Sequence, residues 1–394
     1  MRDVIVVGGG PVGILLACLL AERGVDVEVL ERRTEPSMLA RAIGIHPPSM
    51  KVLRQAGVAE EVLARAVRIE TGSVQSGGRT LGRLSFAQMA GRFPFVVALP
   101  QHETEAVLRA RFEELRPDGL RSGVGVGMLH DRGHHVDVIA EASPEAIRDA
   151  AAEGADDNGL EIVGSARYVV VADGARGQLR DAVGIASRPL GGGDTYLMAD
   201  YPDTGEHGTE AVLFFEKGGV VESFPLPNGR RRWVALTPTL MPEASLADLT
   251  ALVLSRTGVL LPTSDAVPSS FSVRQRLAAT MVQGRVLLAG DAAHEISPIG
   301  GQGMNLGWSD ARVFAPLIAR MTTGHLSTQR DVAAAVSRQQ RAIRRASWQA
   351  ELNMRLGRPL PGPLVGIRDL ALRTALNGPA MPILADAYTM RWLR

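Results

Sequence analysis

A glycine turn near the start of the chain carries residues that could bind a dinucleotide. Gly8, Gly10 and Gly13 have the spacing G-x-G-x-x-G directly after the apolar run Val4–Val7. Gly8 permits the tight turn, Gly10 lets a pyrophosphate approach the backbone, and Gly13 lets a helix and a strand pack closely. The free N–H groups and the positive dipole end of the following helix would hold the phosphates.

The segments on either side of this turn have the order that a dinucleotide site needs. Val4–Val7 reads as a buried parallel strand, Ile14–Arg23 as a helix and Val25–Leu30 as a second strand. Glu31 closes the second strand and could accept hydrogen bonds from a ribose diol. The glycines alone would be weak evidence, because glycine turns also occur in other α/β proteins. The complete unit is a strong signal.

Two acid-glycine pairs occur far downstream. Asp173–Gly174 follows the predicted buried strand Tyr168–Ala172, and Gly290–Asp291 lies within RVLLAGDAAH. Taken singly, each aspartate could simply cap a turn. The glycines of SGVGVGMLH do not form a second nucleotide turn, because a helix precedes them, no helix follows, and the spacing is G-x-G-x-G; we predict a glycine-rich strand.

Composition excludes several classes of protein. The 394 residues are 45% hydrophobic with a net charge of +1, which supports a large core and gives no field for nucleic acid or an anionic membrane. Cys18 is the only cysteine, so an intramolecular disulfide, a redox dithiol and a multi-cysteine metal site are excluded, and we expect no metal. The run Ile14–Leu20 is too short to span a bilayer, and no cleavable leader precedes the first strand; we therefore expect a cytoplasmic protein.

The order of the predicted elements indicates an interrupted nucleotide-binding domain. We predict an α/β fold class: a Rossmann-like nucleotide-binding domain with an inserted, mainly antiparallel β-sheet domain and a helical C-terminal tail. Asn228–Gly229 gives the strongest hairpin signal within the sheet. The predicted nucleotide-binding parts are 1–72, 101–187 and 276–356, the substrate sheet comprises 73–100 and 188–275, and the tail is 357–394. Within the second part, the segment from Glu141 to Gly159 reads as a surface excursion.

Together these motifs resemble the FAD-dependent monooxygenases of the aromatic hydroxylase type, the p-hydroxybenzoate hydroxylase-like family. The resemblance covers essentially the whole chain in order, and GDAAHEISPIGGQGMNLGWSDA is its longest and most specific match. DGARGQLR departs slightly, since the family often has Ser where this chain has Gly177. We expect the chain to lack the thioredoxin-like C-terminal domain of the longer relatives that act on polyketides.

The resemblance implies FAD as the cofactor and a role for each matching residue. Arg41 would bind the phosphates or lie near the flavin, Gln101 would contact the sugar part, and Asp173 lies on a motif associated with FAD and NAD(P)H. Asp291 would accept hydrogen bonds from the ribityl chain. The N-terminus of the helix entered by residues 300–305 would stabilise negative charge on the reduced ring. The implied cofactor residues are Gly8, Gly10, Pro11, Val12, Gly13, Glu31, Arg32, Arg41, Gln101, Asp173, Asp291, Gly301, Gly303, Met304 and Asn305.

The resemblance also implies the reaction. NAD(P)H would reduce the flavin, and a flavin C4a-hydroperoxide formed with O2 would hydroxylate an aromatic or polycyclic small molecule. The chain has one dinucleotide fingerprint, so NAD(P)H would bind transiently at a surface groove. The alternatives are a same-fold epoxidase, reductase or halogenase, or a non-catalytic flavoprotein redox switch. A halogenase is disfavoured, because the chain has no W-x-W-x-I-P motif and both lysines, Lys51 and Lys217, fall outside a plausible site.

The substrate is expected between the flavin and the inserted sheet. Val221, Ser223 and Pro225 share one face of a predicted strand by alternation, and Trp233 lies on the returning strand. Ordinary sheet packing is the alternative role of these residues. No arginine stands where the family would bind a carboxylate, which favours a larger or less charged substrate. The pocket candidates are His46, Val221, Ser223, Pro225, Trp233 and Pro298; no catalytic residue is assigned, and His294 is expected to pack behind the flavin loop.

Overall fold

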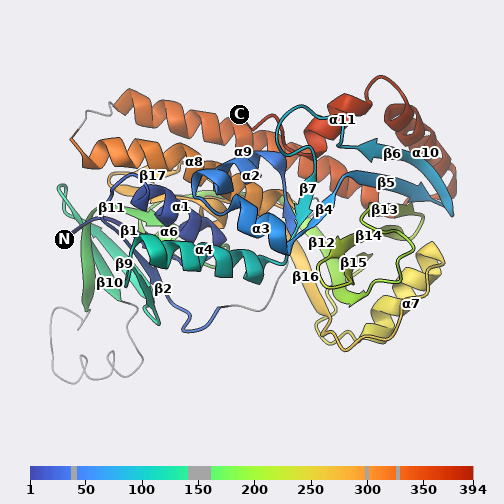
Figure 1. Ribbon diagram of the computed structural model, residues 1–394, viewed down its shortest axis with the longest axis horizontal. Coiled ribbons are helices and arrows are strands. Elements are labelled where there is room, and N and C mark those ends of the chain that lie inside the picture. The colour runs from blue at the N-terminus through green and yellow to red at the C-terminus, as the bar shows by residue number, and fades with distance from the viewer. Residues whose placement is uncertain (37–41, 141–160, 298–300, 325–328, 394) are drawn as a thin grey trace.

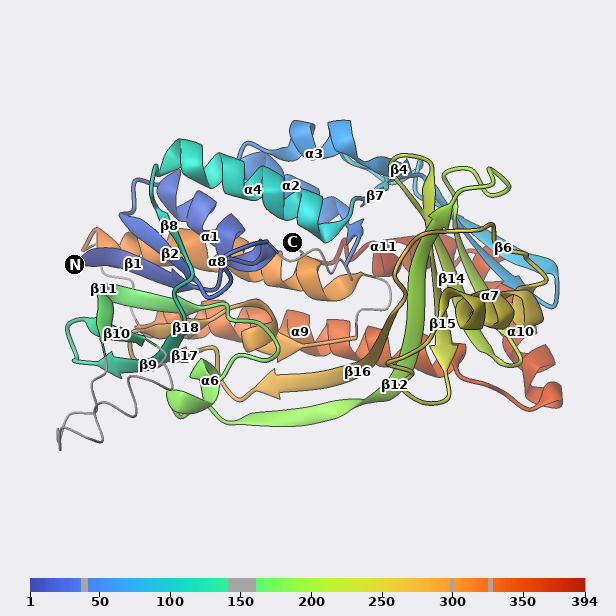
Figure 2. The ribbon, with the colours of Figure 1, turned by 90° about the horizontal axis from the view of Figure 1, so that it is seen from below.

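The computed structural model describes residues 1–36, 42–140, 161–297, 301–324 and 329–393. The predicted surface excursion from Glu141 to Gly159 lies outside these residues. Two large sheets lie toward opposite ends of an elongated molecule, and the long helix α9 (Gln329–Gly357) runs along both (Figures 1 and 2). Within the described residues, no helix is long and apolar enough to cross a membrane.

The nucleotide-binding sheet is built on five parallel strands in the order β18-β11-β1-β2-β8. Val4 to Val7 of β1 are all buried, as expected of a central strand covered on both faces. The strands β9 and β10 add an antiparallel ribbon on the side opposite to α1 and α4 (Figure 2). The elements are β1 (Arg2–Val7), α1 (Pro11–Ala21), β2 (Val27–Glu31), α4 (Gln101–Leu115), β8 (Leu120–Ser122), β9 (Val126–Asp131), β10 (Val136–Ala140), β11 (Ile162–Val171), α6 (Leu179–Ala182), β17 (Val282–Gln283), β18 (Val286–Leu288), η1 (Gly290–Ala292) and α8 (Gln302–Thr322).

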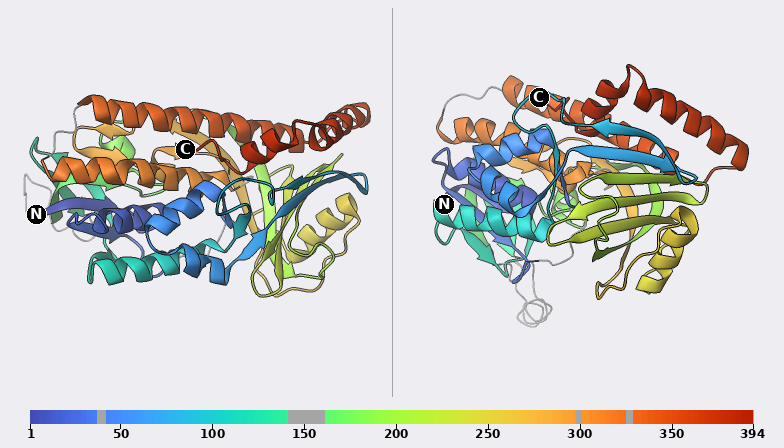
Figure 3. Two further views of the ribbon diagram at one scale, coloured as in Figure 1. Left: turned by 45° about the horizontal axis from the view of Figure 1, so that its top comes forward. Right: turned by 45° about the vertical axis from the view of Figure 1, so that its right-hand side comes forward.

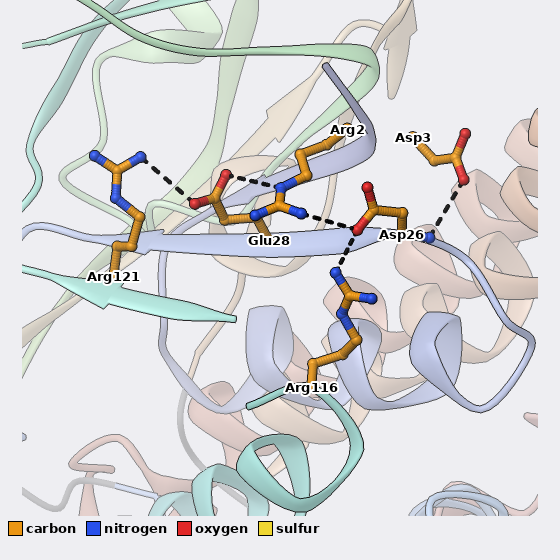
Figure 4. Close-up of polar contacts among 6 residues, drawn as sticks. All are labelled: Arg2, Asp3, Asp26, Glu28, Arg116 and Arg121. Carbon is orange, nitrogen blue, oxygen red and sulfur yellow. Dashed lines mark hydrogen bonds and ion pairs between the residues drawn. The ribbon is translucent and has the colours of Figure 1, made fainter. Parts of the chain in front are cut away.

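Charged side chains join the amino-terminal ends of the parallel strands. Arg2 Nη1 lies 3.2 Å from Asp26 Oδ1, and Arg2 Nε lies 3.5 Å from Glu28 Oε2 (Figure 4). Arg121 Nη1 of β8 lies 3.5 Å from Oε1 of the same glutamate. Arg116, just after α4, also pairs with Asp26. These arginines are partly exposed, so each pair adds little stability. The glycine turn follows the carboxyl end of β1, so these charges lie at the opposite end of the strand from it.

The second sheet has the strand order β19-β16-β12-β15-β14-β13-β5-β6 and is antiparallel except for the pair β13 and β5. Asn228 and Gly229 connect β14 to β15, with φ angles of 60° and 63° that match the predicted tight hairpin. Helix α7 packs against one face, and α9 packs against the other (Figure 3). The elements are β5 (Thr71–Ser76), β6 (Arg79–Ser85), β12 (Ser187–Pro202), β13 (Ala211–Glu216), β14 (Gly219–Leu226), β15 (Arg230–Thr237), α7 (Leu246–Thr257), β16 (Ser269–Ala278) and β19 (His294–Glu295).

A small three-stranded sheet and short helices connect the two large sheets. Its central strand is β7 (Val96–Ala98), which pairs with β3 (Gly44–Ile45) and β4 (Val67–Ile69). The remaining helices in the described part of the chain are α2 (Pro47–Gln55), α3 (Ala59–Arg65), α10 (Gly362–Asn377) and α11 (Met381–Tyr388). The predicted fold class is therefore confirmed, including the helical C-terminal part. The exact domain boundaries stay a prediction.

Candidate functional site

The glycine turn between β1 and α1 has the geometry that its sequence predicts. Gly8 has φ +111°, and a Cβ there would lie 2.3 Å from the carbonyl oxygen of Ala172. A Cβ on Gly13 would lie 2.0 Å from the Gly8 oxygen, so that glycine lets the helix pack against the turn. A Cβ on Gly10 would have no protein atom within 4 Å. Gly8 and Gly13 are thus fixed by protein contacts, whereas Gly10 borders open space.

That open space is a large cavity along the carboxyl ends of the parallel strands. It holds about 2240 Å³ of space free of protein atoms, part of which is open to solvent. Most of the predicted cofactor residues line it although they come from distant parts of the sequence. They are Gly8, Gly10, Pro11, Val12, Glu31, Arg32, Gln101, Asp173, Asp291, Gly301, Gly303 and Met304. Its lining residues come from β1, β16 and α8 among other elements, and its position at the carboxyl ends of the parallel strands suits a dinucleotide.

Glu31 is positioned by hydrogen bonds at the end of β2. Its Oε2 accepts from the N–H of Gly9 at 2.6 Å, and its Oε1 accepts from the backbone and side chain of Arg33, both at 2.9 Å. Burial raises the pKa of Glu31, but the hydrogen bonds from Arg33 and Gly9 outweigh this and lower it below its ordinary value. The side chain is therefore an ionised acceptor at the cavity wall, suited to a ribose diol.

Asp291 lies in the short helix η1 with its side chain open to the cavity, although protein atoms surround it. Behind it, His294 Nε2 lies 2.6 Å from Asp310 Oδ2, and both side chains are fully buried. The backbone N–H of Gly290 donates to the same carboxylate oxygen at 2.9 Å. His294 thus packs behind the predicted flavin loop, as expected, and joins that loop to α8.

In the loop after β11, the Asp173 side chain occupies space that is free only because residue 177 is a glycine. A Cβ at residue 177 would lie 1.9 Å from the Asp173 Cγ, so the serine that the family often carries would displace this carboxylate. Asp173 Oδ2 accepts a hydrogen bond from the Leu179 N–H at 3.3 Å. Within the described residues its Oδ1 has no partner, and burial raises the pKa of Asp173. The departure from the family pattern therefore comes with a specific placement of Asp173 at the cavity.

The Asn305 side chain forms hydrogen bonds with the protein backbone. Its Oδ1 accepts from the His46 N–H at 2.8 Å, and its Nδ2 donates to the carbonyl oxygens of Gly44 and Gly301 at 2.8 and 2.5 Å. It does not line the large cavity, and neither does Gly13. Asn305 instead attaches the strand β3 to the start of α8, where Gly301 and Gly303 border the cavity. Arg41 and Pro298 lie outside the described residues.

A second, smaller cavity lies against the antiparallel sheet. It holds about 750 Å³ of space free of protein atoms, part of which is open to solvent, and its lining is mainly apolar. Ile69, Phe86, Val96, Phe224 and Phe271 contribute most of the large apolar side chains, and His46 is also at its wall. The two cavities share the lining residues Ala42, Phe271 and Gly301, so they meet at one point.

The structure corrects the predicted pocket lining on β14 and β15. Val221 and Trp233 pack beneath α7, in the core between that helix and the sheet. Ser223 and Pro225 share their side of the strand, and Ser223 accepts a hydrogen bond from Arg231. Val221, Ser223 and Pro225 do share one face of β14, as the alternation predicts, but the cavity lies against the opposite face of the strand. The residues of these two strands that line it are Glu222, Phe224, Arg232 and Val234.

Several polar residues at the two cavities were missed. Glu105, Arg274 and Glu295 line the large cavity, and Glu222 and Arg232 line the small one. Glu105 lies one helical turn after Gln101 and accepts its hydrogen bond at 2.8 Å, a spacing visible in the sequence. Glu222 is a carboxylate inside the apolar strand GVVESFPL, which is a signal for a buried polar site.

Comparison with known proteins gives the family. Residues 1–347 match the family model described as FAD binding domain, and the chain therefore belongs to that family. It is 30% identical to 6-methylpretetramide 4-monooxygenase from Streptomyces rimosus over 336 residues, which are 82% of this chain and 56% of that protein. The chain spans about three fifths of the length of the curated relatives it matches. FAD is thus the cofactor of this fold, as the glycine turn and Asp291 indicate.

Solved structures show the same fold. The p-nitrophenol 4-monooxygenase from Pseudomonas putida superposes with a TM-score of 0.84 at 23% identity, covering 99% of this chain and 98% of that one. The anhydrotetracycline hydroxylase from Streptomyces rimosus has a TM-score of 0.77 at 26% identity, covering 99% and 76%. The resemblance to aromatic hydroxylases seen in the sequence is confirmed.

Proposed function

We propose that the chain is a flavin-dependent monooxygenase that uses FAD, NAD(P)H and O2 to hydroxylate an aromatic or polycyclic small molecule. The observation that carries the proposal is the meeting of the dinucleotide cavity with an apolar cavity at Ala42, Phe271 and Gly301. A flavin ring at this point would face a substrate on the other side. The relatives 6-methylpretetramide 4-monooxygenase and pentachlorophenol 4-monooxygenase are named as oxygenases of small molecules, which supports this arrangement.

The residues at the large cavity can hold FAD as follows. The N-terminus of α1 at Gly10 and Pro11 would hold the pyrophosphate, Glu31 the adenosine ribose, and Asp291 the ribityl hydroxyls. The N-terminus of α8 borders the cavity at Gly301, Gly303 and Met304, and the positive end of its helix dipole would favour negative charge there. FAD, when bound, supplies the oxygen-transfer chemistry, which no side chain of the protein can supply by itself.

The small cavity would orient the substrate and exclude water. Its walls come from the antiparallel sheet, the β3–β7–β4 sheet and α11, so the space is enclosed by three parts of the fold. Tyr388 of α11 packs edge-on against His46 and stacks on Phe86, with ring centroids 5.9 Å apart in both pairs. Such an apolar enclosure limits wasteful release of peroxide by keeping solvent from the reacting atoms.

The halogenase alternative requires a lysine that handles hypohalous acid. Neither Lys51 nor Lys217 is among the residues lining the two cavities in the described part of the chain. This supports hydroxylation over halogenation. NAD(P)H, in this proposal, binds only transiently at the surface.

A turnover assay tests the proposal. The FAD-loaded protein is mixed with NADH or NADPH and a panel of phenols and naphthols in the presence of isotopically heavy O2. We expect oxidation of the nicotinamide and a product whose mass increases by one heavy oxygen atom. The Gly10→Val variant, which should lack FAD, is the matched control. Nicotinamide oxidation that yields only peroxide across the panel, or no oxidation at all, would contradict the proposal.

A further inference from the structure

Glu222 is a buried carboxylate at the wall of the small cavity. It lies in the middle of β14, its side chain is only 6% exposed, and it lines the cavity. Among the described residues, none forms a hydrogen bond or an ion pair with this carboxylate. Burial of a carboxylate without a partner is costly, and it raises the pKa of Glu222 to about 7. A ligand with a hydrogen-bond donor would remove part of that cost.

The nearby arginine is already neutralised. Arg232 of β15 also lines the cavity, but its Nε and Nη2 donate to the two carboxylate oxygens of Asp200 at 2.7 and 2.9 Å. This paired geometry is the one that arginine and carboxylate favour, and it leaves the pair without net charge. Among the described residues that line the cavity, Glu222 is therefore the carboxylate whose charge no neighbouring cation balances when it is ionised, whereas the charge of Arg232 is already balanced by Asp200.

The remaining walls are apolar or aromatic. Phe224 and Val234 stand beside Glu222 on the sheet, and Phe86 and Tyr388 also line the cavity. The charge of Glu222 raises the pKa of Tyr388 in addition to the effect of burial, which places the two groups near one another. A ligand in this space would bury mainly apolar surface and meet one acceptor.

We propose that Glu222 determines substrate specificity: its carboxylate accepts a hydrogen bond from a hydroxyl group of an otherwise apolar aromatic substrate and repels substrates that carry a carboxylate. The inference rests on the proposed function, because it takes the small cavity as the substrate site. A hydrogen bond to a charged group corresponds to an affinity difference of about tenfold to a hundredfold between a hydroxyl compound and its methyl ether. The substrate class is therefore uncharged phenols and fused-ring analogues.

Three probes of nearly equal shape test this. We would measure binding of 2-naphthol, 2-methoxynaphthalene and 2-naphthoate to the FAD-loaded protein by calorimetry and by perturbation of the flavin spectrum. We expect 2-naphthol to bind at least tenfold more tightly than the other two. In Glu222→Gln the preference over the ether should fall below about threefold, and 2-naphthoate should bind more tightly than in the wild type.

Glu216→Gln is the matched control. Glu216 is a buried glutamate on β13 of the same sheet, but it accepts hydrogen bonds from the Gly77 N–H and does not line the cavity. This variant should keep the wild-type preference. Equal affinity of the wild type for the probes, absence of 2-naphthol binding, or an unchanged preference in Glu222→Gln would overturn the proposal. The wild-type comparison decides even if Glu222→Gln fails to fold, which its FAD content and melting temperature would reveal.

Binding and turnover separate this inference from the proposed function. A protein that prefers 2-naphthol through Glu222 but forms no hydroxylated product with NAD(P)H and O2 supports the role of Glu222 as a binding group and contradicts the monooxygenase. A protein that hydroxylates 2-naphthol equally well with glutamate or glutamine at this position supports the monooxygenase and overturns the role of Glu222.

Discussion

His294 Nε2 and Asp310 Oδ2 lie 2.6 Å apart in a region where neither side chain reaches solvent. The Asp310 carboxylate also accepts hydrogen bonds from the Gly290 N–H at 2.9 Å and from Gln339 Nε2 at 2.7 Å. One carboxylate thus connects η1, β19, α8 and α9. Because Asp291 follows Gly290 directly, this buried pair fixes the backbone that presents Asp291 to the cofactor cavity.

Removing the histidine should weaken both the fold and FAD binding. His294→Leu leaves a buried carboxylate with one donor fewer, and loss of one partner from a buried pair costs about 3–5 kcal/mol. We expect a lower melting temperature and at least a tenfold weaker affinity for FAD, measured by fluorescence titration. His130→Leu, at an exposed position on β9, is the control. Unchanged FAD affinity would show that the pair has no influence on the loop.

The same pair predicts a pH dependence with a definite sign. Burial lowers the pKa of His294, but its attraction to Asp310 outweighs this and raises the pKa above the ordinary value. A group with a raised pKa in the folded state stabilises at low pH, and the stabilisation is lost as the pH rises through that pKa. The difference in unfolding free energy between the wild type and His294→Leu should therefore shrink at alkaline pH. A constant difference would mean that His294 is neutral throughout.

Gly10 and Gly8 should respond differently to the same substitution. A valine at residue 10 meets no protein atom within 4 Å of its Cβ, so Gly10→Val should fold yet exclude the pyrophosphate and lose FAD. A valine at residue 8 would need a positive φ and would overlap the Ala172 carbonyl, so Gly8→Val should destabilise the apoprotein itself. Flavin absorbance and the melting temperature of the apoproteins measure the two effects. If Gly10→Val retains full flavin occupancy, the phosphates bind elsewhere.

Asp291→Ala tests the role of the carboxylate in the Gly290–Asp291 turn. If it accepts hydrogen bonds from the ribityl hydroxyls, its loss should cost about 1.5–3 kcal/mol of binding, or roughly a tenfold to hundredfold increase in the dissociation constant of FAD. Secondary structure should persist when FAD is supplied in excess. Asp181→Ala is a suitable control, because Asp181 lies in α6 with a largely exposed side chain and does not line the cavity. An unchanged dissociation constant would assign Asp291 to capping the turn.

The dinucleotide site could be predicted from the sequence because its residues belong to local motifs. The turn at Gly8 and Gly10, the acid at the end of β2 and the GD turn each depend on a few consecutive residues. Their convergence followed from parallel topology, which brings the carboxyl ends of strands to one edge. Gly177 was seen only as a missing hydroxyl, because the overlap of a side chain there with Asp173 depends on three-dimensional placement.

The sequence does not reveal which face of β14 lines the cavity, and the reason is physical. Alternation divides a strand into two faces but does not say which one meets a helix and which one meets a cavity. Val220 and Val221 are both buried, so apolar character did not distinguish the faces. The choice is made by α7, whose Leu249 and Val253 pack with Val221. The glutamate at position 222 was the informative residue, since an unpaired carboxylate in an apolar strand is costly without a ligand.

The final prediction concerns the stability that Glu222 costs the protein. Burial raises its pKa from 4.5 to about 7 in the folded state, so folding disfavours the ionised form. Wild-type stability should therefore fall as the pH rises from below 4.5 to above 7, by about 3 kcal/mol relative to a residue that does not titrate. Glu222→Gln keeps the size of the side chain and removes the charge. It should be more stable than the wild type at pH 8 and nearly equal to it at pH 4.5, measured by denaturant unfolding of the apoprotein.

Other charged and titratable groups near Glu222 could also contribute to the pH dependence of the unfolding free energy. Arg232 and Asp200 pair with each other, and the pKa values of Tyr196 and Tyr388 are raised far above this range by burial and by Glu222. His46 lines the same cavity, so the experiment is repeated in a His46→Gln background. A stability gain at pH 8 together with weaker binding of 2-naphthol would show that the carboxylate serves the ligand at the expense of the fold. Equal stability of the wild type and Glu222→Gln at both pH values would mean that Glu222 is solvated through the cavity and ionises normally.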